Sequence, residues 1–467
     1  MTEFSSSAAP QPPLANKLYF AAWRWHFYAG LFVVPFLLIL AVTGFFMMLL
    51  TTVLPEYGDR LRVIPTAAPL SVAQQITAAI AGVDGGTGAA RYITPYQPDR
   101  AALITVNGPQ TPVIVALDPY TGTLLRQTAD GDTWYAWLEK VHGTLLIGTT
   151  GDRLLEIAAG LGLVMICTGL YLWWPRADRR FSQILIPNLA ARGRAFWKSL
   201  HEVLGFWTSV LLAAFLVTGM AWAGIWGDHW VKAWNSFPAE KWGAPLSDKT
   251  HISLNGSGAK EVPWGLELTP LPTSGSQAGV QVLEPGVVLD MATMVHLGQI
   301  LGFENRFQIA APADDTGVWT LSQDSMSYDG SGPTGDRTVH VDQYTGKVLA
   351  DVRYADYPLG AKAMAVGIAL HEGQVGLVNV VVNLLVLLSI GTICVSGIVL
   401  WWKRRPAFAA RLAAPPRPAE MPLWKGALAI TVGLSMLFPL IGVTLVAVLA
   451  LDVLIVQNVP VLKRALS

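Results

Sequence analysis

The chain has 467 residues, of which 52% are hydrophobic and only 14% are charged. Soluble domains usually carry about 25% charged residues, so this composition indicates a membrane protein. The 32 basic and 32 acidic residues give a net charge of +0, which provides no overall attraction for nucleic acid. Two cysteines, without a Cys-x-x-Cys-His motif, exclude a disulfide framework and covalent haem attachment.

Five apolar stretches are long enough to supply the roughly 20 helical residues that cross a hydrocarbon core about 30 Å thick. They are residues 27–54, 157–174, 203–226, 376–402 and 426–451. The first stretch is long, follows a polar segment and lacks a small-residue cleavage site, so we interpret it as a signal anchor rather than a cleaved signal peptide. We therefore expect an α-helical integral membrane bundle.

Basic residues predict which loops face the cytoplasm. They cluster between the second and third spans and directly after the fourth span: Arg176, Arg179, Arg180, Arg192, Arg194 and Lys198, then Lys403, Arg404 and Arg405. These loops and the N-terminus are expected in the cytoplasm, and the polar regions 55–153 and 227–372 outside it. Lys463 and Arg464 would also lie outside if the fifth stretch crosses the membrane, which departs from the rule.

An internal duplication organises the chain. In the first and third spans, a histidine is followed by Gly four residues later and by a Thr-Gly pair beginning seventeen residues later. These residues are His26, Gly30, Thr43 and Gly44, and His201, Gly205, Thr218 and Gly219. The second and fourth spans each follow a histidine and end in a hydroxyl residue, Gly and two Trp. These are His142, Thr168, Gly169, Trp173 and Trp174, and His371, Ser396, Gly397, Trp401 and Trp402.

The polar regions repeat an Asp-x-x-Thr-Gly motif at Asp118 and Asp342, which is typical of a strand entering a tight turn with Gly at positive φ. We therefore predict two copies of helix, external α/β domain and helix, followed by one extra helix. The second copy has an insertion at about 246–279, which is rich in Gly, Pro and Ser and is expected to be a surface loop or a substrate lid.

The predicted segments, in chain order, are these. Residues 1–54 form the N-terminus and span one, 55–153 the first external domain, 154–175 span two, 176–200 a basic loop, 201–226 span three, 227–372 the second external domain, 373–402 span four, 403–424 a linker, 425–452 span five and 453–467 the C-terminal tail.

The four duplicated histidines are the candidate ligands. His26 and His201 are expected near the cytoplasmic ends of their spans, and His142 and His371 at the outer ends. If the copies pack around a pseudo-two-fold axis, each side of the membrane holds one pair, which suits bis-histidine ligation of a b-type haem. Single histidines at membrane interfaces are usually amphipathic surface residues, and Zn²⁺ usually needs three or four clustered protein ligands.

Other residues have predicted roles around these pairs. Gly30 and Gly205 would leave room for a flat macrocycle, and Arg24 and Arg194, with Lys198, could pair with haem propionates. The four remaining histidines are expected to have ordinary surface or core roles: His229, His251, His296 and His340. Cys167 and Cys394 are interpreted as packing residues, and Asn379 and Asn383 as a polar stripe that hydrogen-bonds between helices or contacts haem or substrate.

The histidine spacings, the Trp-Trp exits and the Asp-x-x-Thr-Gly hairpins together resemble the PepSY-associated transmembrane helix family, described as iron-regulated inner-membrane proteins. The resemblance covers nearly the whole chain and implies two external α+β PepSY-like domains, two haems on His26, His142, His201 and His371, and location in the bacterial inner membrane. It also implies similarity to siderophore reductases, which pass electrons outward to a ferric siderophore.

The expected function is therefore transmembrane reduction of a ferric complex. The sequence contains no dinucleotide-binding or Walker motif, so the electron donor is expected to be another protein, a soluble reductant or a membrane quinol. The alternative is a non-redox membrane module whose external domains bind or regulate a protein partner. A transporter is disfavoured because ionisable residues midway through the spans are lacking.

Overall fold

The structure is a computed structural model that describes residues 14–66, 68–175, 182–255, 262–284, 286–329, 332–405, 412–415, 425–451, 454–455 and 458–461. The predicted basic residues Arg176, Arg179, Arg180, Lys463 and Arg464 lie outside these ranges. The chain divides into two compact units. The helical unit comprises Met1–Val42, Thr144–Trp226 and Leu385–Ser467, and the sheet unit comprises Thr43–Gly143 and Gly227–Leu384.

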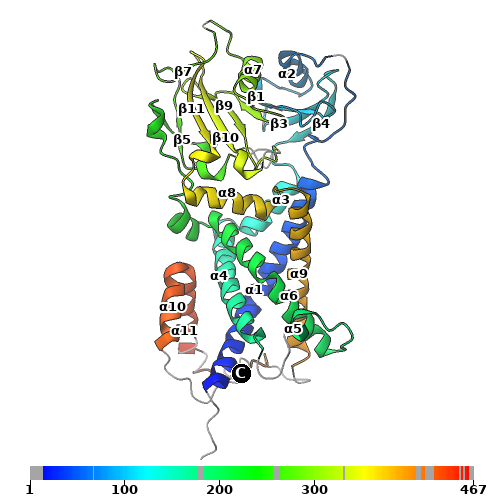
Figure 1. Cartoon of the computed structure of the whole chain (residues 1–467), viewed down its shortest axis with the longest axis vertical. Helices are drawn as coiled ribbons and strands as arrows, with labels where there is room; N and C mark the ends of the chain where they lie inside the picture. The colour runs from blue at the N-terminus through cyan, green and yellow to red at the C-terminus, as the bar shows by residue number, and fades with distance from the viewer. Residues whose placement is uncertain are drawn as a thin grey trace, which may run out of the picture. The chain divides into compact units, whose positions relative to one another are not determined.

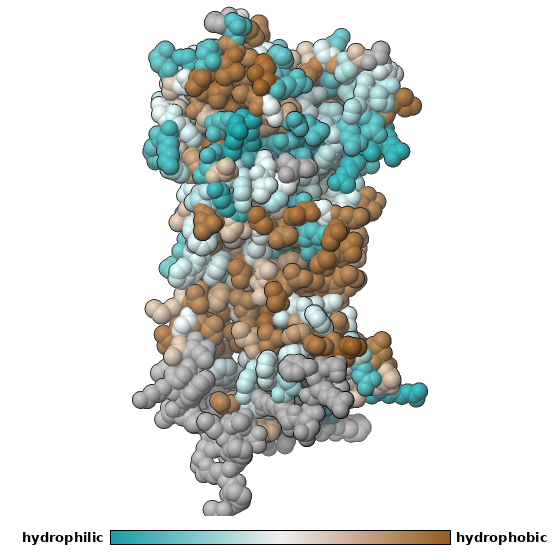
Figure 2. Space-filling model, viewed as in Figure 1, coloured by the Kyte–Doolittle hydropathy of each residue, from teal (hydrophilic) through white to brown (hydrophobic). Residues whose placement is uncertain are grey.

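Four helices are long and apolar enough to cross a membrane within the described part of the chain. They are α1 (Leu14–Thr52), α4 (Thr149–Trp173), α6 (Arg194–Gly219) and α9 (Leu377–Trp402), with a short α5 (Ser182–Leu185) before α6. Val33, Leu216 and Ile390, from three of these helices, share one buried core with Ala159 of α4. Figure 2 shows a largely hydrophobic surface over the helices of this unit. The four duplicated spans are confirmed as helices suited to a membrane.

The stretch predicted as a fifth span does not form one continuous helix, because the chain breaks there into two helices, α10 (Lys425–Leu437) and α11 (Pro439–Leu451). Proline lacks the N–H of a continuing helix and favours the first position of a new one. The two helices lie side by side in Figure 1. The break residue Phe438 stacks on Trp226, with ring centroids 6.3 Å apart. Each helix has 13 residues, or about 20 Å, which is too short for a hydrocarbon core of about 30 Å.

This hairpin predicts that the chain beyond α11 returns to the side from which α10 entered. In a variant without Cys167 and Cys394, Asn458→Cys should react with a membrane-impermeant maleimide from the same side as Leu189→Cys, in the α5–α6 loop. Val288→Cys in the sheet unit should react from the opposite side. Labelling of Asn458→Cys together with Val288→Cys would instead establish a complete fifth crossing.

The sheet unit is built on one antiparallel sheet of nine strands in the order β4-β3-β2-β1-β8-β9-β10-β11-β7. The strands are β1 (Ala89–Ile93), β2 (Ala102–Val106), β3 (Val113–Leu117), β4 (Leu124–Ala129), β7 (Val280–Gln281), β8 (Gln308–Ala310), β9 (Val318–Gln323), β10 (Arg337–Asp342) and β11 (Lys347–Arg353). The two copies meet where Tyr92 of β1 pairs with Ile309 of β8. The two predicted external domains are therefore joined through a single sheet.

The order of strands on either side of this junction is the same, as the duplication requires. Helices α2 (Val72–Ala81) and α7 (Met291–Ile300), one from each copy, pack on this sheet and share one hydrophobic core with it (Figure 1). Ala79 of α2 and Leu297 of α7 are fully buried in that core. The central strands bury side chains on both faces, since Ile104 and Val115 lie in this core and their neighbours Leu103 and Ile114 lie in a second core.

The duplicated turn motif forms the predicted tight turns. Asp118 Oδ1 accepts a hydrogen bond from the Tyr120 N–H at 2.8 Å, and Gly122 has φ of 72°. In the second copy, Asp342 Oδ1 accepts from the Tyr344 N–H at 2.9 Å, and Gly346 has φ of 68°. A side-chain carboxylate that binds the turn backbone, followed by Gly in the left-handed region, closes each hairpin without a steric penalty.

The insertion of the second copy is not a surface loop where the structure describes it. It contains β5 (Leu246–Thr250) and β6 (Pro270–Pro272), which pair with each other. Trp264 and Leu266 are almost fully buried, and Leu266 shares a core with Tyr357 and with Ala361 of α8 (Leu359–Glu372). Apolar side chains thus make the insertion part of the support of α8.

Candidate functional site

His26 on α1 and His201 on α6 lie together in the helical unit. Their ring centroids are 6.2 Å apart and their planes are nearly perpendicular, at 89°. A metal ion between two imidazoles makes bonds of about 2 Å to each nitrogen, which lies roughly 1 Å from its ring centre, so two ligating rings have centroids about 6 Å apart. The predicted pairing of these two histidines is therefore present at a separation that suits axial ligation.

Both inner histidines are held through Nδ1 by a neighbouring helix. His26 Nδ1 lies 3.2 Å from the Met165 carbonyl and 3.1 Å from Thr168 Oγ1 on α4. His201 Nδ1 lies 3.1 Å from both the Ile393 carbonyl and Ser396 Oγ on α9. A carbonyl oxygen only accepts, so we assign the hydrogen of each ring to Nδ1. The lone pair on Nε2 is then available for a metal, as is usual for ligating histidines.

The glycines around the inner pair have two different roles. A Cβ at Gly169 or Gly397 would lie 3.1 Å or 3.4 Å from the nearest atom of a histidine ring, so these glycines let His26 and His201 pack against the helix backbone. A Cβ at Gly205 would meet no atom of the described residues within 4 Å. A Cβ at Gly30 would meet only Met165 Cε, at 3.5 Å, among them. At both predicted glycines, a side chain would therefore meet little or no protein among the described residues.

Of the two predicted arginines, Arg24 donates to the Pro415 carbonyl and to Tyr28 Oη, and Arg194 is exposed in the first turn of α6. The sequence did not single out Arg404 as a cofactor contact. Its guanidinium packs on Trp23 and Phe27, and its buried Nε and Nη2 have no hydrogen-bond partner among the described residues. Buried donors of this kind indicate a missing acceptor, and haem propionates would supply one.

His142 and His371 form the second pair, within the sheet unit. They lie on the separate helices α3 (Trp134–Thr144) and α8, and not on the membrane spans themselves. Residues with positive φ, among them Gly148 and Gly376, end the connection between each short helix and the following span. These histidines precede their spans in the chain, as expected, and each lies on a short helix of its own.

The environment of the outer pair keeps both imidazoles neutral. Thr43 Oγ1 lies 2.7 Å from His142 Nδ1, which gives the Thr-Gly motif of the first span a direct role. Burial lowers the pKa of His142 to about 4. Burial, together with the nearby His142, lowers the pKa of His371 to about 4. A neutral imidazole is the form that ligates a metal, so this pair is ready for ligation at neutral pH.

Asn379 and Asn383 form the predicted polar stripe. Asn379 Nδ2 donates to the Leu370 carbonyl at 2.9 Å, and Asn383 Nδ2 donates to the carbonyls of Leu370 and His371 at 2.6 and 3.0 Å. The stripe thus satisfies carbonyls at the C-terminal end of α8 and orients the turn that carries His371. Of the two roles considered from the sequence, hydrogen bonding between helices is the one observed.

Comparison with known protein families identifies the family of the chain. The family model of the PepSY-associated TM region matches residues 23–404. The chain belongs to this family. The match includes all four duplicated histidines, and no curated protein matches the chain. Membership in the PepSY-associated family agrees with the four membrane helices and the large antiparallel sheet.

The sheet unit of this PepSY-associated protein also contains a buried histidine pair that the sequence assigned to ordinary roles. His251 Nδ1 donates to the Thr269 carbonyl at 2.7 Å, which leaves His251 Nε2 to accept from His340 Nε2, 2.8 Å away. His340 Nδ1 then accepts from the Thr320 hydroxyl at 3.0 Å. Every polar atom of this pair is used, so its role is to join the insertion to the sheet.

This buried pair predicts acid sensitivity of the sheet unit. Burial lowers the pKa of His251 to about 4, below the usual value of 6.5, so the unfolded chain binds a proton at a pH where the folded chain does not. Stability should fall as pH decreases from about 6.5 to 4, by up to about 3 kcal/mol for this group. In thermal unfolding of the purified protein, His251→Gln should lose less stability between pH 7 and 5 than the unaltered chain. An identical pH dependence would contradict this.

Proposed function

We propose that this protein is a transmembrane reductase that holds two b-type haems, one on each histidine pair, and passes electrons across the bacterial inner membrane to a ferric complex. The observation that supports it most is the inner pair, in which two helices present imidazoles at a ligating separation and two other helices fix their Nδ1 atoms. The family resemblance suggests a ferric siderophore as the substrate.

Haem iron, when bound, supplies reversible one-electron chemistry. The residues of the inner site would hold and orient the haem. His26 and His201 present Nε2, while the carbonyls of Met165 and Ile393 stop each ring from turning. A histidine that donates a hydrogen bond through Nδ1 is also a more basic ligand. The same contacts would therefore affect the reduction potential of an iron bound at Nε2. Arg404 supplies unused donors for a carboxylate.

The outer pair would hold the haem that delivers electrons to the ferric complex. His142 and His371 are buried and neutral, so they would bind iron without first losing a proton. Reduction of ferric to ferrous iron weakens its bonds to hard oxygen donors, so release of the metal from a hydroxamate or catecholate complex follows from electron delivery. The donor on the other side is proposed to be a quinol or a protein reductase, because the sequence has no nucleotide-binding motif.

This function predicts a red protein with about two haems per chain. The absorption spectrum should show a Soret band that shifts on reduction, and a pyridine haemochrome assay should give the stoichiometry. His371→Ala should lose one haem and retain the other, because the pairs occupy different units. His296→Ala, a change of an exposed histidine on α7, is the matched control and should retain both.

Two results would contradict the proposal. Colourless protein from haem-replete cells would favour the alternative, a membrane-anchored module that binds or regulates a partner without redox chemistry. Loss of both haems from His371→Ala, with the control intact, would argue against two separate sites.

The open space at Gly205 gives a second prediction. Gly205→Leu adds a side chain where no described atom lies within 4 Å, so the protein without haem should fold and accumulate normally. If a macrocycle occupies this space, the variant should lose about half of its haem, that of the inner site, in the same haemochrome assay. Full haem content would show that Gly205 faces lipid instead.

A further inference from the structure

The two copies differ at the outer edges of the nine-stranded sheet. On the second-copy side, β7 covers the edge of β11 at its first two residues, where Val280 pairs with Val348 and Gln281 pairs with Lys347. On the first-copy side, β4 ends the sheet and has no neighbouring strand among the described residues. The outward-facing backbone N–H and C=O groups of this six-residue strand, which belong to alternate residues, thus form an edge of about 20 Å that is open to pairing.

The duplication makes β4 the counterpart of β11. Both strands follow the Asp-x-x-Thr-Gly turn closely, and Leu125 and Leu349 each lie three residues after its Gly. Both also have the same irregularity in their pairing, since the register shifts between Ala116 and Leu117 in one copy and between His340 and Val341 in the other. Leu125 and Leu349 occupy the same place at this bulge. The covered edge is therefore a template for what fits the open one.

These two leucines differ in burial. Leu349 is 4% exposed and packs in a small core with Ala244 and Val318, against which Ala278, just before β7, also packs. Leu125 is 38% exposed. The second copy thus buries this leucine with residues that include one just before β7, while the equivalent leucine of the first copy is partly exposed. Exposed apolar groups beside an unpaired edge favour strand addition by another chain.

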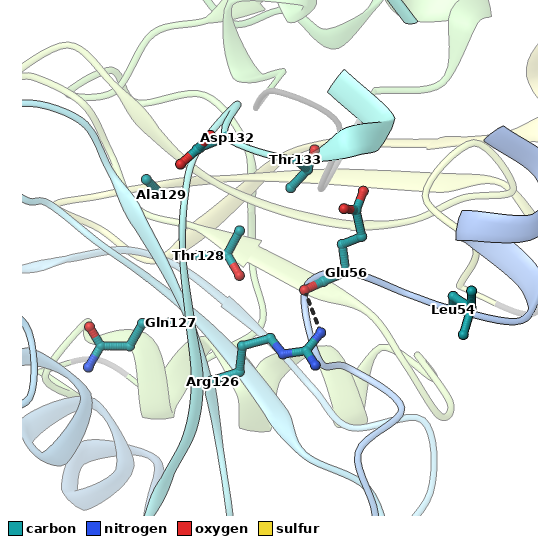
Figure 3. A pocket seen from close by; sticks show the side chains of 8 residues that line it. All are labelled: Leu54, Glu56, Arg126, Gln127, Thr128, Ala129, Asp132 and Thr133. Carbon is teal, nitrogen blue, oxygen red and sulfur yellow. Dashed lines mark hydrogen bonds between the residues drawn. The ribbon is translucent and has the colours of Figure 1, made fainter. Parts of the chain in front are cut away.

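The surface beside β4 is shaped to receive an extended chain. An open groove of about 410 Å³ is lined by four consecutive residues of this strand, 126–129. Figure 3 shows these residues along one side of the groove, Leu54 and Glu56 facing them, and Asp132 and Thr133 at its end. Successive residues of a strand point to opposite faces of its sheet, so a groove that contacts four in a row follows the edge itself.

The walls of this groove are held in place. Glu56 accepts hydrogen bonds from the N–H groups of Trp134 and Tyr135 at 2.9 and 2.7 Å, which fixes its carboxylate at the start of α3. Arg126 Nη1 donates to the Glu56 carbonyl at 2.9 Å, the contact drawn in Figure 3. A preformed groove of this kind lowers the entropy cost of ordering a bound peptide.

We propose that β4 is a docking edge for an extended polypeptide segment of a partner protein, which adds antiparallel to β4 as β7 adds to β11. The segment would alternate apolar and polar residues and place a small apolar side chain against Leu125, as Ala278 does against Leu349. Main-chain hydrogen bonds provide the affinity in such strand addition, and the covered side chain provides the specificity. This site does not depend on the proposed reductase function.

The covered edge supplies a probe. A fluorescein-labelled peptide with the sequence of residues 276–284, Ser-Gln-Ala-Gly-Val-Gln-Val-Leu-Glu, is titrated with the full-length protein in detergent and followed by anisotropy. Saturable binding is expected, together with slower hydrogen exchange of the amides of residues 125–129. A peptide with Pro in place of the central Val should bind at least about tenfold more weakly, because Pro removes a donor and does not fit a paired strand.

Changes in the protein complete the test. Leu125→Asp should weaken binding by about tenfold or more, because it puts a charge where the apolar contact forms. Val288→Asp, a change at another exposed position of the same unit, is the matched control and should bind like the unaltered protein. No saturable binding, binding that Leu125→Asp leaves unchanged, or exchange protection elsewhere than in residues 125–129 would each overturn the proposal.

Discussion

The hydrogen bond from each inner histidine to the backbone of a neighbouring helix is the interaction on which the arrangement of the helical unit depends. His26 on α1 reaches the Met165 carbonyl on α4, and His201 on α6 reaches the Ile393 carbonyl on α9. Each bond joins the two spans of one copy, and the two rings then meet across the copies. A buried imidazole needs a partner for Nδ1–H, so the same contact satisfies a polar group in an apolar region and directs Nε2 to its ligand.

The duplication provides this geometry in both copies, but the two copies also differ from each other. The sheet keeps the same strand order, turn and bulge in both copies. The second copy adds an insertion, buries His251 against His340 with it, and covers the first two residues of β11 with β7. In the first copy Ala116 stands at the position of His340, next to the bulge. The halves of the sheet are therefore alike in backbone and different in what covers them.

Prediction from the sequence was most successful where a signal is local. Asp118 and Gly122 form the expected turn because the carboxylate, the turn backbone and the glycine are within five residues of one another. The fifth span was predicted from hydropathy alone. Hydropathy does not show where a helix ends, and in the structure a new helix begins at Pro439. The insertion was expected to be a surface loop because its composition is rich in Ser and Gly. Trp264 and Leu266 of the insertion are nevertheless buried, by residues distant in the chain.

The roles of the hydroxyl residues show the same limit. Thr168 and Ser396 were recognised from the sequence only as part of a repeat, because their contacts with His26 and His201 join residues more than a hundred positions apart. Arg404 was recognised only as a basic residue after a span, because its packing on Trp23 depends on how α1 and α9 approach each other.

The sequence by itself determined the membrane class, the four spans, the duplication and the four histidines that it repeats, because hydropathy and spacing are properties of the chain that need no partner. Only the tertiary structure decided how these parts are used. It brought His26 to His201, placed His142 and His371 on short helices that precede the spans in the chain, and merged two predicted domains into one sheet. Each of these depends on which surfaces bury one another, and burial is a property of the folded molecule.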